Sequence, residues 1–311
     1  MLKDYLRLHL IVFLWGFTAI LGKLISLPPV ELVFYRTLIA AVGLIGLLVL
    51  RGLPWRVPAG QALRMLGVGV LVAAHWITFF LAARLSSVSV CLAGMATLAL
   101  WTSVLEPVLL RKKFQPYEIL LGLLAMAGLY LVSQAEFDQL LGLGVAIGSA
   151  GLSALFSVLN VKLIKDHPPL RLTLYEMAGA CLSIMLFLIA RPAFGGPLPL
   201  LDPTPTDWLW LVLLAGVCTV YAFSTSVELM KRLSAFAVNL TINLEPVYGI
   251  VLAVLMYWLR VPGFGQEKLS AGFYVGTCII LLSVLIHPLL NQWQLRRRRP
   301  GPDAAVSLVE R

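Results

Sequence analysis

Five ionisable side chains lie inside long apolar runs of this 311-residue sequence: Arg36, Glu106, Glu176, Glu228 and Glu245. A charge at the centre of a bilayer costs at least about 2.5–3.5 kcal/mol, so such residues are candidates for function by default. Groups of this kind bind a substrate of opposite charge, carry a proton or hold helices together. We interpret these five as coupling or structural charges, and Glu245 also as a candidate for substrate binding.

Glu245 has the sequence context best suited to chemistry. Pro246 follows it and frees a backbone carbonyl, and a carboxylate at such a place could bind a cationic group or a proton. The alternative is a neutral carboxylic acid that is hydrogen-bonded to a neighbouring helix. Glu106 also precedes a proline, but it lies 22 residues after the start of Arg-Leu-Ser at 84–86, whereas Glu245 lies 13 after the same tripeptide at 232–234. The two carboxylates are therefore expected at different depths.

Small polar residues recur at helical spacing in three of the apolar runs. Residues spaced by three and four share one face of a helix, so each set forms a polar stripe. Such stripes line a cavity or mediate helix packing, and the sequence leaves open which face of the run 234–258 lines a cavity. The stripes are Ser149, Ser153, Ser157 and Asn160; Tyr221, Thr225 and Glu228; Asn239 with Asn243; and Thr241 with Glu245 and Tyr248.

Aromatic residues within the runs add a second kind of candidate. Tryptophan faces suit apolar or cationic substrates through stacking and cation–π contacts, and a histidine can titrate near neutral pH. Both residue types also fill space in ordinary packing. The predicted substrate-binding set is Trp15, His75, Trp76, Trp101, Ser153, Ser157, Asn160, Tyr221, Asn239, Asn243 and Glu245.

The sequence around these residues is that of an integral membrane protein. Hydrophobic residues make up 60% of the chain and charged residues 13%, against about 25% charged in soluble domains. The apolar runs are continuous, which favours helices of about 20 residues over alternating barrel strands. The expected fold class is all-α, with ten transmembrane helices at about residues 6–26, 32–50, 65–83, 87–110, 116–134, 142–164, 170–190, 207–230, 234–258 and 270–290.

The chain repeats itself. Residues 28–36 (PPVELVFYR) resemble residues 168–176 (PPLRLTLYE), and Arg-Leu-Ser also occurs twice at nearly the same offset, 148 residues against 140. Each copy holds five helices, so the second copy is inverted, as in secondary transporters whose substrate site lies near the midplane. Arg36 and Glu176 occupy equivalent places and are expected on opposite faces, with Glu176 near Arg171 or the loop cations.

The basic residues predict the topology. Of the 24 lysines and arginines, 18 fall on the side of the two termini and five on the other side. By the positive-inside rule both termini are cytoplasmic. The +9 net charge is thus topological and indicates no nucleic-acid binding. The expected units are a five-helix repeat at 1–135, a second at 136–292 and a basic flexible cytoplasmic tail at 293–311 that contacts lipid headgroups.

The sequence contains no motif for a cofactor, a metal or soluble-type catalysis. Its four cysteines fall inside apolar runs without metal spacing or evident pairing. No Walker motif is present, which excludes an ATP-driven pump on this chain alone. We therefore expect no cofactor, no metal and no enzyme activity.

Short motifs accompany this layout: Pro29 to Thr37 opening the second helix, Trp76 to Ala82 in the third, Leu244 to Val247 in the ninth, and Gly122 with Gly128 in the fifth. Together they resemble the EamA-like family of the drug/metabolite transporter superfamily over nearly the whole chain, to about residue 290. The resemblance implies two EamA-like units and export or exchange of small metabolites, such as amino acids, across a bacterial cytoplasmic (inner) membrane. The chain departs from the family at 111–113 and 260–263, where a Gly-Glu pair is common.

The sequence therefore predicts a secondary transporter that moves small metabolites such as amino acids or related compounds by alternating access. Its partners would be a small-molecule substrate, a proton as coupling ion and membrane lipids, and both monomer and homodimer stay open. One alternative is a flippase for lipids or lipid-linked substrates. Another is an integral membrane enzyme, for which Glu106 and Glu176 are the only carboxylates expected at one face.

Overall fold

Every regular element in the described part of the computed structural model, residues 2–86, 88–133, 139–199, 201–260 and 270–298, is a helix. This confirms the all-α prediction. The first half of the chain forms α1 (Leu2–Leu24), α2 (Pro29–Leu50), α3 (Ala59–Leu85), α4 (Val88–Met95), α5 (Leu98–Leu110) and α6 (Pro116–Ser133). The second half forms α7 (Leu140–Leu163), α8 (Pro169–Ala190), η1 (Arg191–Phe194), α9 (Pro205–Leu213), η2 (Leu214–Tyr221), α10 (Ala222–Leu229), α11 (Ala235–Ile242), α12 (Glu245–Trp258) and α13 (Ala271–Arg298).

Among the described residues, nine helical segments are long and apolar enough to cross a membrane, and a shorter apolar helix lies at Pro116–Val132. Four of the nine segments join successive elements: α4 with α5, α8 with η1, α9 with η2 and α10, and α11 with α12. The chain is thus a multi-pass membrane protein with nine to ten apolar helices. α13 continues past the predicted end of its run to Arg298, and residues 299–311 of the predicted tail lie outside the described residues.

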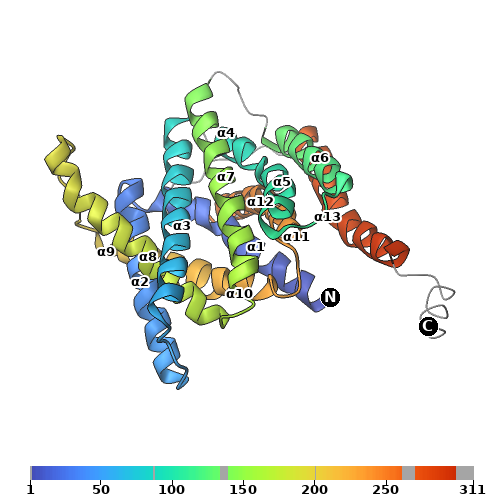
Figure 1. Ribbon diagram of the computed structural model, residues 1–311. Coiled ribbons are helices and arrows are strands. Elements are labelled where there is room, and N and C mark those ends of the chain that lie inside the picture. The colour runs from blue at the N-terminus through green and yellow to red at the C-terminus, as the bar shows by residue number, and fades with distance from the viewer. Residues whose placement is uncertain (1, 87, 134–138, 200, 261–269, 299–311) are drawn as a thin grey trace, which may run out of the picture.

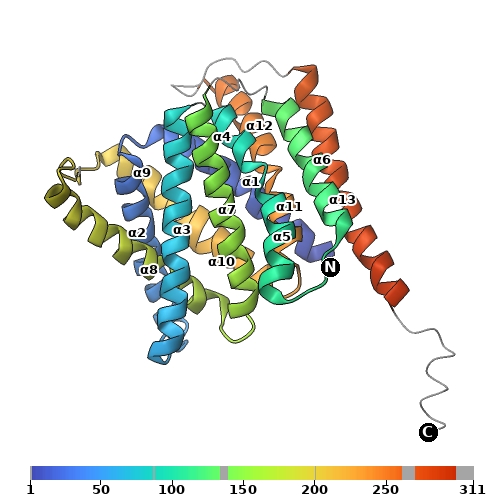
Figure 2. The same cartoon turned by 45° about the horizontal axis from the view of Figure 1, so that its top comes forward.

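The two halves of the chain share one core. Helices of the first half pack directly on helices of the second: α3 on α7 and α8, α2 on α8, α1 on α12, and α6 on α13. In Figures 1 and 2, α6 and α13 run side by side at one edge, while α2, α8 and α9 gather at the opposite edge. The helices between these edges, together with Arg36 of α2, line the pocket described below.

Two helices begin at the repeated prolines. α2 starts at Pro29 and α8 at Pro169, each preceded by another proline in extended conformation. Proline suits the first helical turn, because its fixed φ is helical and its missing N–H would be unpaired there anyway. The repeated Pro-Pro pair therefore marks the start of a helix in each half of the chain.

Two of the spans are broken at corresponding places, between α4 and α5 and between α11 and α12. At the breaks, Thr97 N–H bonds to the Gly94 carbonyl and Asn243 N–H bonds to the Leu240 carbonyl, which is a tighter turn than the α pattern. In the second span Pro246 follows and has no N–H to continue the ladder. Discontinuous helices of this kind expose backbone groups near the middle of a membrane protein.

The breaks also settle the register of the two halves around Glu245. The break after Arg-Leu-Ser at 84–86 begins at residue 96, and the break after the tripeptide at 232–234 begins at residue 243, an interval equal within one residue. The counterpart of Glu245 is therefore the start of α5 near Leu98. Glu106 lies near the other end of α5 and is therefore not the counterpart of Glu245.

Glycines bring α3 and α8 into backbone contact. A Cβ on Gly69 would collide with the Glu176 carbonyl oxygen, and a Cβ on Gly179 would collide with the Leu66 backbone. Because rigid backbone stands at both points, a side chain cannot be accommodated by a rotamer change.

We expect Gly69→Ala to lower stability at this contact by about 1–3 kcal/mol, the usual cost of overpacking. The measurement is the thermal unfolding midpoint of the purified protein in detergent. Gly67→Ala is the matched control, since a Cβ there meets no atom within 4 Å on the same helix. Equal midpoints for the two variants would contradict the close approach of α3 and α8.

Candidate functional site

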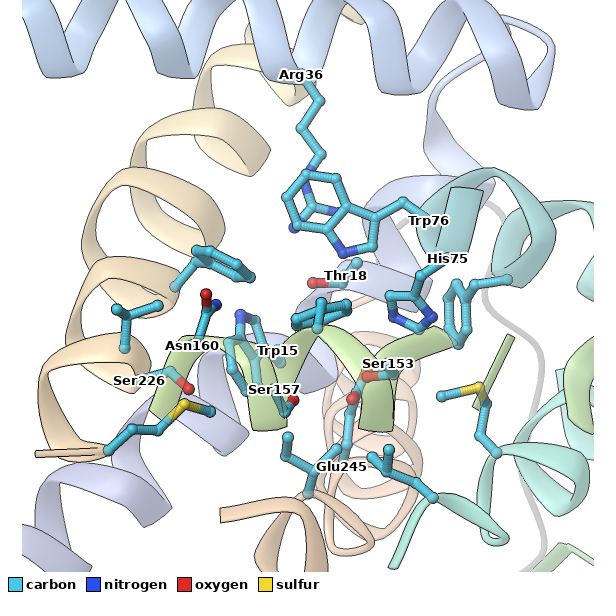
Figure 3. Close-up of a pocket in the computed structure, with 18 residues that line it drawn as sticks. Trp15, Thr18, Arg36, His75, Trp76, Ser153, Ser157, Asn160, Ser226 and Glu245 are labelled. Atoms are coloured by element: carbon cyan, nitrogen blue, oxygen red, sulfur yellow. The ribbon is translucent and has the colours of Figure 1, made fainter. Parts of the chain in front are cut away.

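A pocket lies where the broken helices meet the central helices (Figure 3). Its empty volume is about 710 Å³, part of it open to solvent. Residues from both halves of the chain line it: Trp15, Thr18, Arg36, His75, Trp76, Phe79, Met95, Leu98, Ser153, Phe156, Ser157, Asn160, Phe223, Ser226, Val227, Met230, Ile242 and Glu245.

Arg36 is the cation of this pocket. Its side chain extends from α2 and is only 2% exposed. The Nε atom donates to Thr219 Oγ1 at 2.9 Å, and the guanidinium carbon lies 3.7 Å from the centre of the Trp76 ring. Nη1 has no hydrogen-bond partner. Thr219 thus holds one edge of the guanidinium group and Trp76 covers one of its faces, while the Nη1 donor is left for a ligand.

The segment that holds Arg36 is a π-helix, η2. The wider turn lets the Thr219 hydroxyl donate to the Leu214 carbonyl, five residues back, at 3.2 Å while it accepts from Arg36. Trp15 Nε1 donates to the Cys218 carbonyl at 2.9 Å, which ties η2 to α1. π-helical turns are rare and occur mainly at functional sites. Within this turn, the Thr219 hydroxyl and the Cys218 carbonyl each accept a hydrogen bond from a side chain of another helix.

Glu245 is the anion of the pocket and faces Arg36 from the opposite side (Figure 3). The two groups interact electrostatically across the pocket but form no ion pair within 4.0 Å. Glu245 begins α12, and a helix N-terminus favours negative charge. The space between the two side chains can therefore receive a solute that carries either charge or both.

Hydroxyl and amide groups of α7 form the polar floor of the pocket. Ser153, Ser157 and Asn160 line it together, as their helical spacing predicts. Ser157 donates to Asn239 Oδ1 at 3.2 Å, and the Asn239 amide donates to Thr102 Oγ1 at 2.8 Å. These two hydrogen bonds fix the Ser157 side chain and join α7, α11 and α5.

His75 and the aromatic residues form the remaining wall. His75 Nδ1 lies 2.9 Å from Ser149 Oγ, and Ser149 Oγ in turn donates to the His75 carbonyl at 2.9 Å, so the ring is fixed between α3 and α7. Phe223 makes edge contacts with Trp76 and tilted contacts with Phe156. The wall offers aromatic faces on which an apolar or planar body can stack.

Four of the predicted substrate-binding residues do not line this pocket. Trp101 is 42% and Tyr221 47% exposed on the outside of the bundle. Asn239 acts behind Ser157, and Asn243 lines a smaller neighbouring cavity of about 270 Å³. Besides Arg36, the pocket residues outside the predicted substrate-binding set include the polar Thr18 and Ser226 and the aromatic Phe79, Phe156 and Phe223. No spacing signal separates them from ordinary core positions.

The remaining charged candidates lie away from the pocket. Glu228 pairs with Arg7 at 3.0 Å near the end of the bundle. Glu176 is fully buried between helices, and its predicted neighbour Arg171 instead donates to the Pro54 carbonyl at 3.4 Å. Glu176 was expected near Arg171 or the loop cations; its contact in the described structure is Asn160, and Arg171 on the same helix bonds elsewhere.

Glu106 anchors the end of α5 to the start of α11. Its carboxylate accepts from Lys112 Nζ at 2.7 Å and from the Phe236 backbone N–H at 2.8 Å. The second bond satisfies an N–H in the first turn of α11 that has no partner within the helix. Glu106 thus has a structural contact on each side.

We expect Glu106→Ala to lower stability by about 2–3 kcal/mol, because it leaves a buried N–H without its charged acceptor. Lys112→Ala should cost less than about 1 kcal/mol, since that ammonium is half exposed. Thermal unfolding midpoints of both variants test this ranking. A larger loss for Lys112→Ala would show that the ion pair, and not the backbone bond, secures α11.

Polar contacts close the bundle at its two ends. At one end, Asp207 accepts from the Ser26 N–H at 2.8 Å and hydroxyl at 2.7 Å, and Arg191 pairs with Glu31 at 2.8 Å. At the other end, Arg232 pairs with Asp4 at 2.7 Å, close to the pair of Arg7 and Glu228. The described His, Cys, Asp and Glu side chains form no group that could hold a metal ion.

A helical membrane bundle around a pocket with charge, hydroxyls and aromatic walls has the architecture of a small-solute membrane protein. The profile of the EamA-like transporter family matches residues 4–134 and 140–287. The chain belongs to this family, within the drug/metabolite transporter superfamily. No curated protein matches the chain. A solved structure described as "Crystal structure of protein" shares 18% identity, with a TM-score of 0.74 over 94% of this chain and 98% of that one, and so shares the fold.

Proposed function

We propose that this protein is a secondary transporter that carries small metabolites, such as amino acids or related compounds, across a membrane by alternating access. The observation that carries the proposal is the pocket between the two family repeats, with Arg36 on one wall and Glu245 on the other. A site at the meeting point of two repeats is where secondary transporters bind their substrates.

The arrangement of the halves supports alternating access. The repeats, if they consist of five helices each, are inverted, and the matching breaks before α5 and α12 are consistent with that symmetry. Contacts between segments distant in sequence close both ends: Ser26 with Asp207 at one end, and Asp4 with Arg232 at the other. Rocking of the halves would open one set of contacts while the other stays closed.

We further propose a bacterial cytoplasmic membrane as the location, with both termini on the cytoplasmic side. The support is the excess of lysine and arginine on the side of the termini. In this orientation the contact of Arg7 with Glu228 lies at the cytoplasmic end and the contact of Glu31 with Arg191 at the outer end.

The pocket chemistry favours a solute with a carboxylate and an ammonium group. The carboxylate would accept from the free Nη1 of Arg36, and the ammonium would lie toward Glu245. Ser153 and Ser157 add hydroxyl contacts, and the aromatic wall receives the apolar part of the solute. A solute of this kind satisfies both buried charges at once, whereas a neutral solute satisfies neither.

Counterflow in proteoliposomes tests the function. Vesicles preloaded with an unlabelled amino acid should take up the labelled form transiently and without any ion gradient, whereas empty vesicles and vesicles without protein should not. A panel of amino acids, nucleobases and cationic drugs identifies the class that is carried. Absence of counterflow for every solute in the panel would contradict the proposed function.

A further inference from the structure

Two buried polar side chains next to the pocket have no hydrogen-bond partner. Glu176 is 0% exposed, and neither of its carboxyl oxygens makes a hydrogen bond. Asn160 is also fully buried, and its amide oxygen and nitrogen are likewise unpaired. The Asn160 amide and the Glu176 carboxyl lie close enough to interact, but without the geometry of a hydrogen bond. Since most buried polar atoms in proteins are satisfied, four unsatisfied atoms in one contact indicate a site that binds something further.

Glu176 faces no cation that could neutralise a carboxylate. α8 packs against α2, α3 and α10, and the charged and titratable groups of these elements, of α8 and of α7 are directed elsewhere. Arg64 and Lys162 are exposed. Of the others, these have partners of their own: Glu31 with Arg191, Tyr35 with Leu201, Arg36 with Thr219, His75 with Ser149, Arg84 with Leu27, Arg171 with Pro54, Cys181 with Thr37, and Glu228 with Arg7.

An ionised carboxyl in these surroundings would be buried without a counter-charge, which is far more costly than a neutral one. Burial disfavours the ionised form of both carboxyls, but Arg36 across the pocket offsets part of this cost for Glu245, whereas the influences on Glu176 among the described residues include no cation. The geometry therefore separates the two carboxyls: Glu245 belongs with the ionic groups of the substrate, and Glu176 with a proton.

The place of Glu176 connects it to the movement that transport requires. Its backbone carbonyl lies against Gly69, at the contact of α3 from the first half with α8 from the second. Its side chain lies beside Asn160, which lines the pocket. A change in the distance between the halves would alter the burial of Glu176, and a solute in the pocket would contact its neighbour.

We propose that Glu176 and Asn160 form a proton-binding site that is coupled to the substrate pocket. The inference rests on the proposed transport function. In this conformation the carboxyl of Glu176 holds the proton. When the halves separate at α3 and α8, its O–H bond breaks, the proton passes to water that enters beside Asn160, and a carboxylate remains. By linkage, protonation of Glu176 and the closed contact of α3 with α8 stabilise each other to the same extent.

Infrared spectroscopy tests the protonation directly and without transport. The purified wild-type protein should show a carboxylic-acid band at neutral pH that is absent in Glu176→Gln and retained in Thr173→Val. Thr173 is a matched control, because it is buried on the same helix and its hydroxyl is also unpaired. The same carboxylic-acid bands in the wild type and in Glu176→Gln would overturn the proposal.

Transport in proteoliposomes tests the coupling. A pH gradient should drive accumulation by the wild type, while Glu176→Gln should keep counterflow within about threefold and lose the gradient-driven accumulation. Thr173→Val should retain both activities. Wild-type counterflow without any response to the gradient, or full accumulation by Glu176→Gln, would overturn the inference. Absence of wild-type counterflow would instead overturn the proposed function.

A second variant covers the case in which Glu176→Gln does not fold. Glu176→Asp keeps a carboxyl but withdraws it from Asn160, so accumulation should persist with a displaced pH profile. An unchanged pH profile would contradict a coupling role for this carboxyl, because the surroundings that set its protonation would have changed without effect.

Discussion

Replacement of Arg36 by glutamine is expected to raise the half-saturation concentration for carboxylate-bearing solutes by about 100-fold, or about 3 kcal/mol. The guanidinium is fixed by Thr219 and Trp76 before any solute arrives, so its free donor needs little reorganisation. Glutamine has no charge and lacks the planar set of N–H donors with which a guanidinium group binds a carboxylate. Arg36→Lys keeps the charge without the planar fork and should show a smaller loss.

The control for this prediction is Thr37→Val. Thr37 is the next residue of α2 and is also fully buried, but its hydroxyl bonds to carbonyls of its own helix and contacts Cys181 of α8, and it does not line the pocket. Counterflow of phenylalanine, 3-phenylpropionate and 2-phenylethylamine separates the effects of the two ionic groups. Unchanged half-saturation for phenylalanine and phenylpropionate in folded Arg36→Gln would show that the carboxylate binds elsewhere.

Glu245→Gln should change the half-saturation concentrations of the same three solutes in the opposite pattern. The half-saturation concentration of phenylethylamine and phenylalanine should rise by about 10- to 100-fold, because the counter-charge of the ammonium is lost. That of phenylpropionate should fall, because Arg36 no longer has the Glu245 carboxylate to neutralise it. The two changes of opposite sign follow from the placement of the two charges on facing walls.

Tyr248→Phe is the control for Glu245→Gln. Tyr248 lies one turn further along α12, where its hydroxyl is 3.0 Å from His9 Nδ1, and it does not line the pocket. It should leave the ranking of the three solutes unchanged. A uniform loss for all three in Glu245→Gln would mean that this carboxyl supports the structure of the pocket and does not select the ligand.

The fold followed from short-range patterns that need no knowledge of neighbours. Continuous apolar runs predicted the helices, and Pro29 and Pro169 marked the first turns of α2 and α8. The breaks in the spans were not predicted. The one before α12 has a sequence signal in Pro246, but the one before α5 has no proline, and its tighter turn depends on packing around the pocket.

The site was predictable only in part, because a stripe of polar residues does not reveal which face meets the pocket. The α7 stripe of Ser153, Ser157 and Asn160 lines it, whereas Tyr221 faces outward from η2. The π-helix shifts the register of the residues along this span, which helical spacing alone cannot anticipate. Arg36 was placed near a membrane face from its position along α2, but its long side chain reaches the pocket.

We propose that this pocket carries the solute and opens to each side of the membrane in turn. Ser157→Cys, in a variant whose four native cysteines are replaced, places a thiol in the pocket floor. A membrane-impermeant thiol reagent should label it when applied to either face, and the transported solute should slow both reactions. Ser103→Cys, buried on α5 outside the pocket, should stay unlabelled. Labelling of Ser157→Cys from one face only, or labelling that the solute does not slow, would contradict the account.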